Sequence, residues 1–202
     1  DIPGVAAVWP RVAVQLDAQA FWMGVPTAIV GGYSEQRLES QTTLAAGRYA
    51  TADEDGVVTL GAEVARQLDA EAGDTVTLRG STYEVAGVLE QESITMLDQS
   101  AFVSLAEART LFIGSLDGIY REAIGDAPFI TSAEVIVEDG VDPDELAERI
   151  ARETDGVIAV GPEKLKSESA GTSSTYSSLA MSMGVIALFA GGFSALHRSR
   201  DG

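Results

Sequence analysis

Two rhythms of apolar residues alternate along this chain, one typical of strands and the other of helices. Val57–Leu60 is a short, mostly apolar run that follows an acidic turn and ends at Gly61, which predicts a buried strand. In the helix predicted to come next, Val64, Ala65 and Leu68 share one face. The change of rhythm between neighbouring segments favours the α+β class.

A hairpin is predicted directly after this helix. Residues 75–79 and 82–89 alternate apolar and polar positions around Gly80 and Ser81. Gly87 lies inside the second strand, and because glycine has no side chain to pack, it is expected to weaken that strand or to mark a bulge.

A strand, a helix and a second strand are predicted late in the chain. Residues 133–137 form an apolar run, and residues 157–160 form another. Between them, Asp142 has the side chain of a helix N-cap and Pro143 suits the first helical position. This order is typical of a βαβ-like unit.

The two ends of the chain are expected to share one sheet. The early apolar runs, residues 12–16 and 28–30, can join the late strand-helix-strand unit. The predicted segments are a first lobe formed by residues 1–46 and 133–168, an inserted β-rich lobe at 47–112, and an irregular connection at 113–132.

The order and spacing of these motifs resemble a known family. The motifs are G-R-x-x-T from Gly47, V-V-x-L-G-x-x-V-A-x-x-L from Val57 and G-D-T-V-x-L-x-G-x-x-Y-x-V-x-G-V-L from Gly73. With the opening I-P-G-V-A-A-V-W-P at residues 2–10, they resemble the extracytoplasmic core domain of MacB-type and FtsX-type ABC transporter permeases. The resemblance implies a porter-like α/β lobe built from both chain ends, with the small β-rich lobe inserted in it.

The C-terminal part of the chain predicts a membrane helix. As a helix, residues 179–196 would extend about 27 Å, close to the hydrocarbon core of about 30 Å. The basic flank at 197–202 is typical of the cytoplasmic side, which places residues before about 179 on the extracytoplasmic side of the cell membrane, with 169–178 as a linker. A soluble buried helix is the alternative.

Small residues recur every fourth position within this predicted membrane helix. Ala187, Gly191 and Ala195 would share one face of the helix. Such a face lets another membrane helix approach closely, so we interpret the three residues as a membrane-helix packing stripe.

The charge of the chain excludes several partners. Its 31 acidic residues outnumber 13 lysines and arginines, which gives a net charge of −18. Such a surface repels nucleic-acid phosphates and anionic lipid headgroups, so no nucleic-acid partner is expected. A protein of a halophile would show this acidity, because high salt screens the self-repulsion, and an ordinary acidic domain would show it as well.

Few residues are suited to catalysis or to metal binding. The chain has no cysteine, and its one histidine, His197, follows the predicted membrane helix, which excludes a histidine-dependent catalytic or metal site in the outer domain. Asp53, Glu54 and Asp55 lack the spacing of an EF-hand loop and are interpreted as an exposed turn. We predict no catalytic residue, no cofactor and no metal.

One apolar cluster is a candidate partner contact. Phe21, Trp22 and Met23 lie between two predicted strands, where a loop is usually polar. Aromatic residues and methionine are enriched at protein interfaces. Burial over the end of the sheet is the alternative interpretation for this cluster.

These observations favour a non-enzymatic function. The resemblance implies the extracytoplasmic domain of an ABC transporter permease, which couples ATP hydrolysis on a separate cytoplasmic ATPase subunit to movement of an external cargo or partner by export, lipoprotein handling or mechanotransmission. It also implies a second permease copy or homologue, and an extracytoplasmic protein, as partners. The alternative function is a cell-surface binding module anchored by a single helix, without transport activity.

Overall fold

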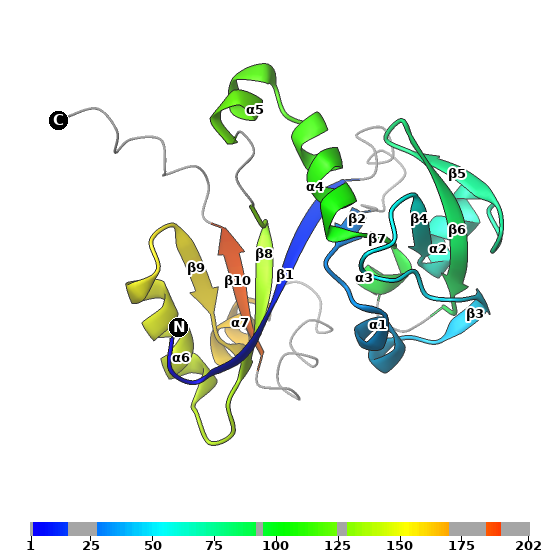
Figure 1. The fold of residues 1–202 in the computed structure, drawn as a ribbon. Coiled ribbons are helices and arrows are strands. Elements are labelled where there is room, and N and C mark those ends of the chain that lie inside the picture. Colours follow the sequence, from blue (N-terminus) through cyan, green and yellow to red (C-terminus); the bar gives the residue numbers. More distant parts are fainter. Residues whose placement is uncertain (1, 16–27, 92–94, 125–128, 170–184, 191–202) are drawn as a thin grey trace. The chain divides into compact units, whose positions relative to one another are not determined.

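The computed structural model describes residues 2–15, 28–91, 95–124, 129–169 and 185–190 (Figure 1). The chain divides into two compact units, the first formed by residues 1–10 and 130–202 and the second by residues 11–129. Both units mix strands and helices, so the predicted α+β class is confirmed. The inserted unit is larger than the predicted lobe at 47–112, because the early strand at 28–31 pairs with a strand of the insertion at 100–103.

The first unit is built on a sheet with the strand order β1-β8-β10-β9. Helix α6 buries Leu146 and Ile150 against Val135 of this sheet. Burying each aliphatic side chain contributes about 1.5–3 kcal/mol. The elements of this unit are residues 5–10 of β1 (Val5–Gln15), β8 (Ser132–Val137), α6 (Pro143–Glu153), β9 (Val157–Val160), α7 (Pro162–Ser169) and β10 (Val185–Ala190).

Helix α6 begins where the sequence predicts. The Asp142 carboxylate accepts hydrogen bonds from the backbone N–H groups of Asp144 and Glu145, at 2.9 and 3.0 Å. Pro143 occupies the first turn, where its missing N–H costs no hydrogen bond. These local signals fix the start of the helix that covers one face of the sheet.

The sequence predicts a membrane helix at 179–196, but the structure has a strand at 185–190. These residues form β10, which pairs antiparallel with both β8 and β9. Length and apolarity do not distinguish a buried strand from a helix, whereas Val185, Ile186 and Phe189 are residue types that favour strands. Residues 179–184 and 191–196 lie outside the described part, in which no helix is long and apolar enough to cross a membrane.

One member of the predicted small-residue stripe lies within the described residues, and the backbone there is a strand. Ala187 lies in β10, opposite Glu134 of β8 and Val160 of β9. A spacing of four residues forms one face only when the intervening backbone is helical. Gly191 and Ala195 lie outside the described residues.

The second unit has the sheet order β3-β6-β4-β7-β2-β1, with β5 pairing on β6. β4 runs parallel to β6 and β2 parallel to β7, whereas β1–β2, β3–β6, β4–β7 and β5–β6 are antiparallel pairs. Its elements are β2 (Ala28–Gly31), α1 (Glu35–Gln41), β3 (Leu44–Gly47), β4 (Val57–Leu60), α2 (Ala62–Leu68), β5 (Thr75–Leu78), β6 (Ser81–Leu89), α3 (Thr95–Asp98), β7 (Ser100–Val103), α4 (Leu105–Gly114) and α5 (Gly118–Ile124).

The predicted irregular connection at 113–132 contains regular structure. It holds the end of α4, the helix α5 and the first residue of β8, while residues 125–128 lie outside the described part. The sequence signal of α5 was weak because the helix has only seven residues and exposes the apolar Ile119 and Tyr120.

The hairpin forms one residue earlier than predicted, and Gly87 lies beside a bulge. Leu78 pairs with Ser81, so the two-residue turn is Arg79-Gly80, with φ of 49° and 84°. In the β4–β6 pair the register shifts between Val58 and Thr59, and Thr59 then pairs with Gly87. This bulge confirms one of the two roles predicted for Gly87.

Gly87→Ala is expected to destabilise the protein. A Cβ at this position would lie 2.4 Å from the Arg48 carbonyl oxygen, which is backbone and cannot move aside cheaply. We expect a loss of about 1–3 kcal/mol in the free energy of unfolding, measured by urea denaturation. The matched control is Gly118→Ala in α5, where a Cβ meets no atom within 4 Å. Equal urea midpoints for the two variants would contradict the close approach.

Candidate interaction surface

The acidic turn at 53–55 is held within the second unit. Arg48 donates two hydrogen bonds to the Glu54 carboxylate, at 2.8 and 2.6 Å. The hydrogen bond from Arg48 is the largest cause of the lowered pKa of Glu54. Asp55 accepts a hydrogen bond from the Ser104 hydroxyl at 2.7 Å. These hydrogen bonds attach the turn to Arg48 and Ser104 of the second unit. Within the described residues, no group of three or more His, Cys, Asp or Glu side chains could hold a metal ion.

Ser104 and Glu107 form a second contact with this turn. The Ser104 hydroxyl oxygen caps α4 by accepting the Glu107 backbone N–H at 3.1 Å, and the Glu107 carboxylate accepts the Gly56 N–H at 2.8 Å. Burial is the main cause of the raised pKa of Glu107, and the Asp55 charge adds to it. The S-x-x-E spacing, typical of a capping box, could have identified this pair from sequence. The Glu107 carboxylate bonds to the Gly56 N–H, however, and not to the backbone of Ser104.

Two arginines flank a buried tyrosine in the same unit. The guanidinium carbons of Arg11 and Arg37 lie 4.7 and 4.9 Å from the centre of the Tyr33 ring. Phe102 meets the same ring edge-on, at 5.1 Å between centroids. Burial raises the pKa of Tyr33 despite the opposing charge of Arg11. A neutral ring that receives two cations on its π-face stabilises the region where the second unit begins at Arg11.

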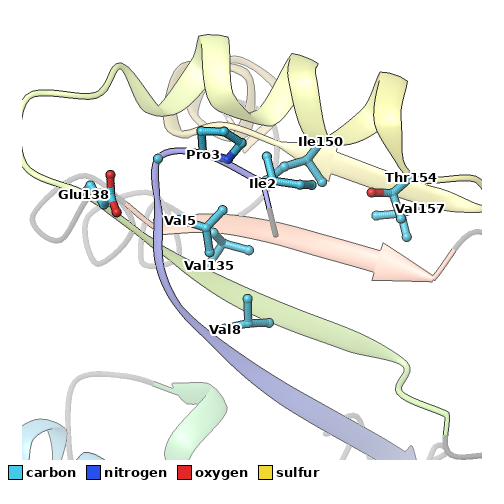
Figure 2. Close-up of a pocket in the computed structure, with 10 residues that line it drawn as sticks. Ile2, Pro3, Val5, Val8, Val135, Glu138, Ile150, Thr154 and Val157 are labelled. Atoms are coloured by element: carbon cyan, nitrogen blue, oxygen red, sulfur yellow. The ribbon is translucent and has the colours of Figure 1, made fainter.

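An apolar groove lies at the surface of the first unit. It occupies about 640 Å³ and lies between the N-terminal segment, β8 and α6 (Figure 2). Val135 and Ile150 are 1% and 3% exposed and form its floor, whereas Val8 at its rim is 49% exposed. Its lining is completed by Ile2, Pro3, Gly4, Val5, Glu138, Thr154 and Val157.

The groove has a polar group at each end. Figure 2 shows Glu138 at one end and Thr154 at the other. Glu138 is exposed, as is its neighbour Asp139. Beside Thr154, the side chains of Glu153 and Asp155 are exposed as well. A lining that is apolar between Glu138 and Thr154 can hold an apolar group, but it offers no nucleophile paired with a base.

The predicted partner contact lies elsewhere in the sequence. Phe21, Trp22 and Met23 are outside the described residues, so this interpretation stays a prediction. Sequence reasoning missed the groove, since its residues come from 2–8, 135–138 and 150–157 and only the fold brings them together. No local sequence pattern marked it, because the exposure of Val8 follows from the fold.

The fold is of the α+β class and divides into two compact units. Residues 1–153 match the family model described as MacB-like periplasmic core domain. The chain therefore belongs to this family and is the extracytoplasmic domain of a MacB-like ABC transporter permease. No curated protein matches this chain.

Several solved structures are similar to this chain at low sequence identity. The extracellular domain of the ABC-type transporter YknZ from Gram-positive bacteria is 17% identical, with a TM-score of 0.50 and 75% of each chain covered. The periplasmic region of MacB from Actinobacillus actinomycetemcomitans is 16% identical, with a TM-score of 0.46, covering 75% of this chain and 68% of that one. A domain of a permease protein from Porphyromonas gingivalis is 14% identical, with a TM-score of 0.44, covering 94% and 74%.

Glu107→Gln is expected to stabilise the protein at neutral pH. The folded-state pKa of Glu107 is raised, so ionisation costs folding stability as pH rises above the usual carboxyl pKa, and the cost is absent at lower pH. The amide keeps the oxygen that accepts the Gly56 N–H. The difference in unfolding free energy between variant and parent should therefore grow from acidic to neutral pH in urea titrations.

The control for this experiment is Glu39→Gln on the exposed side of α1. It removes the same charge but should show no comparable pH-dependent gain. A Glu107→Gln protein that is less stable than the parent at neutral pH would show that the anion's hydrogen bond outweighs its desolvation.

Proposed function

We propose that this domain transmits ATP-driven motion of its permease to a partner or cargo outside the membrane. ATP hydrolysis takes place on a separate cytoplasmic ATPase subunit, and a second permease copy or homologue completes the transporter. The observation that carries the proposal is the division into two compact units within one extracytoplasmic domain. Stiff units joined at few points suit a device that converts motion of the membrane part into motion outside.

Only two chain crossings join the units. They lie at Pro10/Arg11 and at Phe129/Ile130. Proline has no N–H to donate, so Pro10 leaves one strand hydrogen bond unmade at the first crossing. We propose that relative motion is concentrated at these two crossings and that each unit moves as a rigid body.

Both crossings are held firmly on the side of the second unit. Arg11 lies over the Tyr33 ring, at 4.7 Å from its centre. At the other crossing, Arg109 donates a hydrogen bond to the Phe129 carbonyl at 2.9 Å, and the Phe112 and Phe129 rings lie 5.1 Å apart. Such anchors support the proposal because they would confine a change in backbone angle to the crossing itself.

Placement relative to the membrane is part of the same proposal. The described residues before about 179 lie on the extracytoplasmic side, and residues 169–178 link the domain to the rest of the permease. The acidic surface supports this arrangement, since a net charge of −18 disfavours docking onto anionic headgroups.

Co-purification of the intact permease tests this function. A tagged full-length permease, extracted in mild detergent, is expected to carry an ABC ATPase whose activity disappears when its catalytic site is mutated. Deleting residues 11–129 should leave ATPase binding intact while abolishing activity on the external partner. A membrane protein with a single span and no associated ATPase would contradict the proposal and favour the surface-anchored binding module.

A further inference from the structure

The turn at residues 53–56 is attached to the second unit on two sides. On one side, the Glu54 carboxylate accepts two hydrogen bonds from Arg48, at 2.8 and 2.6 Å. On the other side, the Gly56 N–H donates to the Glu107 carboxyl group of α4 at 2.8 Å, across 51 positions of the sequence. Both attachments use a carboxyl group as the acceptor, so the protonation state of each group affects how firmly the turn is held.

The surroundings of Glu107 suit a protonated carboxyl group. Its second oxygen, Oε2, is buried and accepts no hydrogen bond within the described residues. Asp55 faces it from the turn, where the Ser104 hydroxyl holds the Asp55 carboxylate at 2.7 Å, and Tyr83 lies near both carboxyl groups on β6. Burial and the Asp55 charge both raise the pKa of Glu107, and no cation of the described residues opposes them. Ionisation would therefore create a poorly solvated charge beside a like charge.

The surroundings of Glu54 suit the opposite state. Two hydrogen bonds from one guanidinium are strongest when both oxygens belong to an ionised carboxylate. The hydrogen bond from Arg48 is the largest cause of the lowered pKa of Glu54, while Glu35 of α1 and Glu84 of β6 act on Arg48. The side chains of this pair are 53% and 30% exposed, so the pair contributes little to stability.

We propose that the turn at 53–56 is a pH-sensitive clasp, which is fully closed only while Glu54 is ionised and Glu107 is protonated. As pH falls, protonation of Glu54 weakens the attachment to Arg48. As pH rises, ionisation of Glu107 places a second charge beside Asp55 and weakens the attachment to α4. The clasp is therefore expected to be firmest near the ordinary glutamate pKa of about 4.3 and to loosen on either side of it.

The clasp holds the helix that anchors the second crossing between the units. The Gly56 carbonyl oxygen accepts the Glu84 N–H of β6 at 2.9 Å, so the clasp ties α4 to the sheet. Further along α4, Arg109 bonds to the Phe129 carbonyl oxygen, and the Phe112 ring lies against the Phe129 ring. The proposal concerns the second unit alone and requires no motion between units, so it can fail independently of the proposed function.

The test is native-state hydrogen exchange of the Gly56 amide in the 202-residue chain, followed by nuclear magnetic resonance from mildly acidic to neutral pH. Protection is the measured rate corrected for the intrinsic exchange rate at each pH. We expect the protection of Gly56 to fall several-fold as pH rises, because Glu107 ionises. The Gly61 N–H, which donates to the Ser100 carbonyl oxygen at the other end of β4, reports wider opening of the unit and should fall less.

Two matched variants separate the two sides of the clasp. Glu107→Gln and Glu54→Gln each replace a carboxylate by an amide of similar shape and change the net charge equally. At neutral pH, Glu107→Gln is expected to raise the protection of Gly56 several-fold and to remove its dependence on pH. Glu54→Gln should lower the protection by a smaller factor, because the Arg48 pair is exposed. The control, Glu39→Gln on the exposed side of α1, should do neither.

Three results would overturn the proposal. Protection of Gly56 that does not fall as pH rises would show that ionised Glu107 holds the turn as well as the protonated acid does. Equal falls at Gly56 and Gly61 would show that the whole unit opens and not the clasp. Changes of the same sign in Glu107→Gln and Glu54→Gln would assign the effect to net charge.

Discussion

One strand, β1, determines how the rest of the structure can form. Its residues 5–10 neighbour β8 in the first unit, and its residues 12–15 pair with β2 in the second. A strand obtains its backbone hydrogen bonds from neighbours, and β1 obtains them from a different unit in each half. Both cores depend on it, because Val5 packs with the first core while Val12 and Val14 are buried in the second. A change in the register of β1 would disturb both units.

The groove is a consequence of how β1 begins. Residues 2–4 precede the strand and form one wall, and Gly4 accepts a hydrogen bond from the Glu138 backbone N–H at 2.9 Å through its carbonyl oxygen. The same bond fixes the start of the turn that carries Glu138 and Asp139. The N-terminal wall of the groove and Glu138 are therefore positioned by one short segment. Because the wall is backbone held at both ends, the groove can be present before any partner binds.

Local signals allowed much of the fold to be predicted from sequence. Asp142 and Pro143 fixed the start of α6, and the alternation around Gly80 identified the β5–β6 hairpin. The order of these strand and turn motifs was also sufficient to identify the family. In each of these cases the determining interactions lie within a few residues, where spacing alone carries the information.

The sequence did not reveal which segments far apart along the chain pair with each other. The strand β10 forms because its residues pair with β8 and β9. The apolar residues of this strand, considered without those partners, predicted a helix. Gly56 and Glu107 bond across 51 positions, and no local pattern marks that contact. The groove is a similar case, since it is assembled from three separate stretches. Sites of this kind become visible only when tertiary packing is known.

The measurement that tests the account most directly is a pair of distance distributions by electron spin resonance in the intact transporter. The chain has no cysteine, so spin labels can be placed at Glu39→Cys with Ala151→Cys, one in each unit, and at Glu39→Cys with Gln67→Cys within the second unit. Trapping ATP is expected to shift the first distribution and to leave the second unchanged. If neither distribution changes, or if both do, the results contradict the proposal that two rigid units move relative to each other at the two crossings.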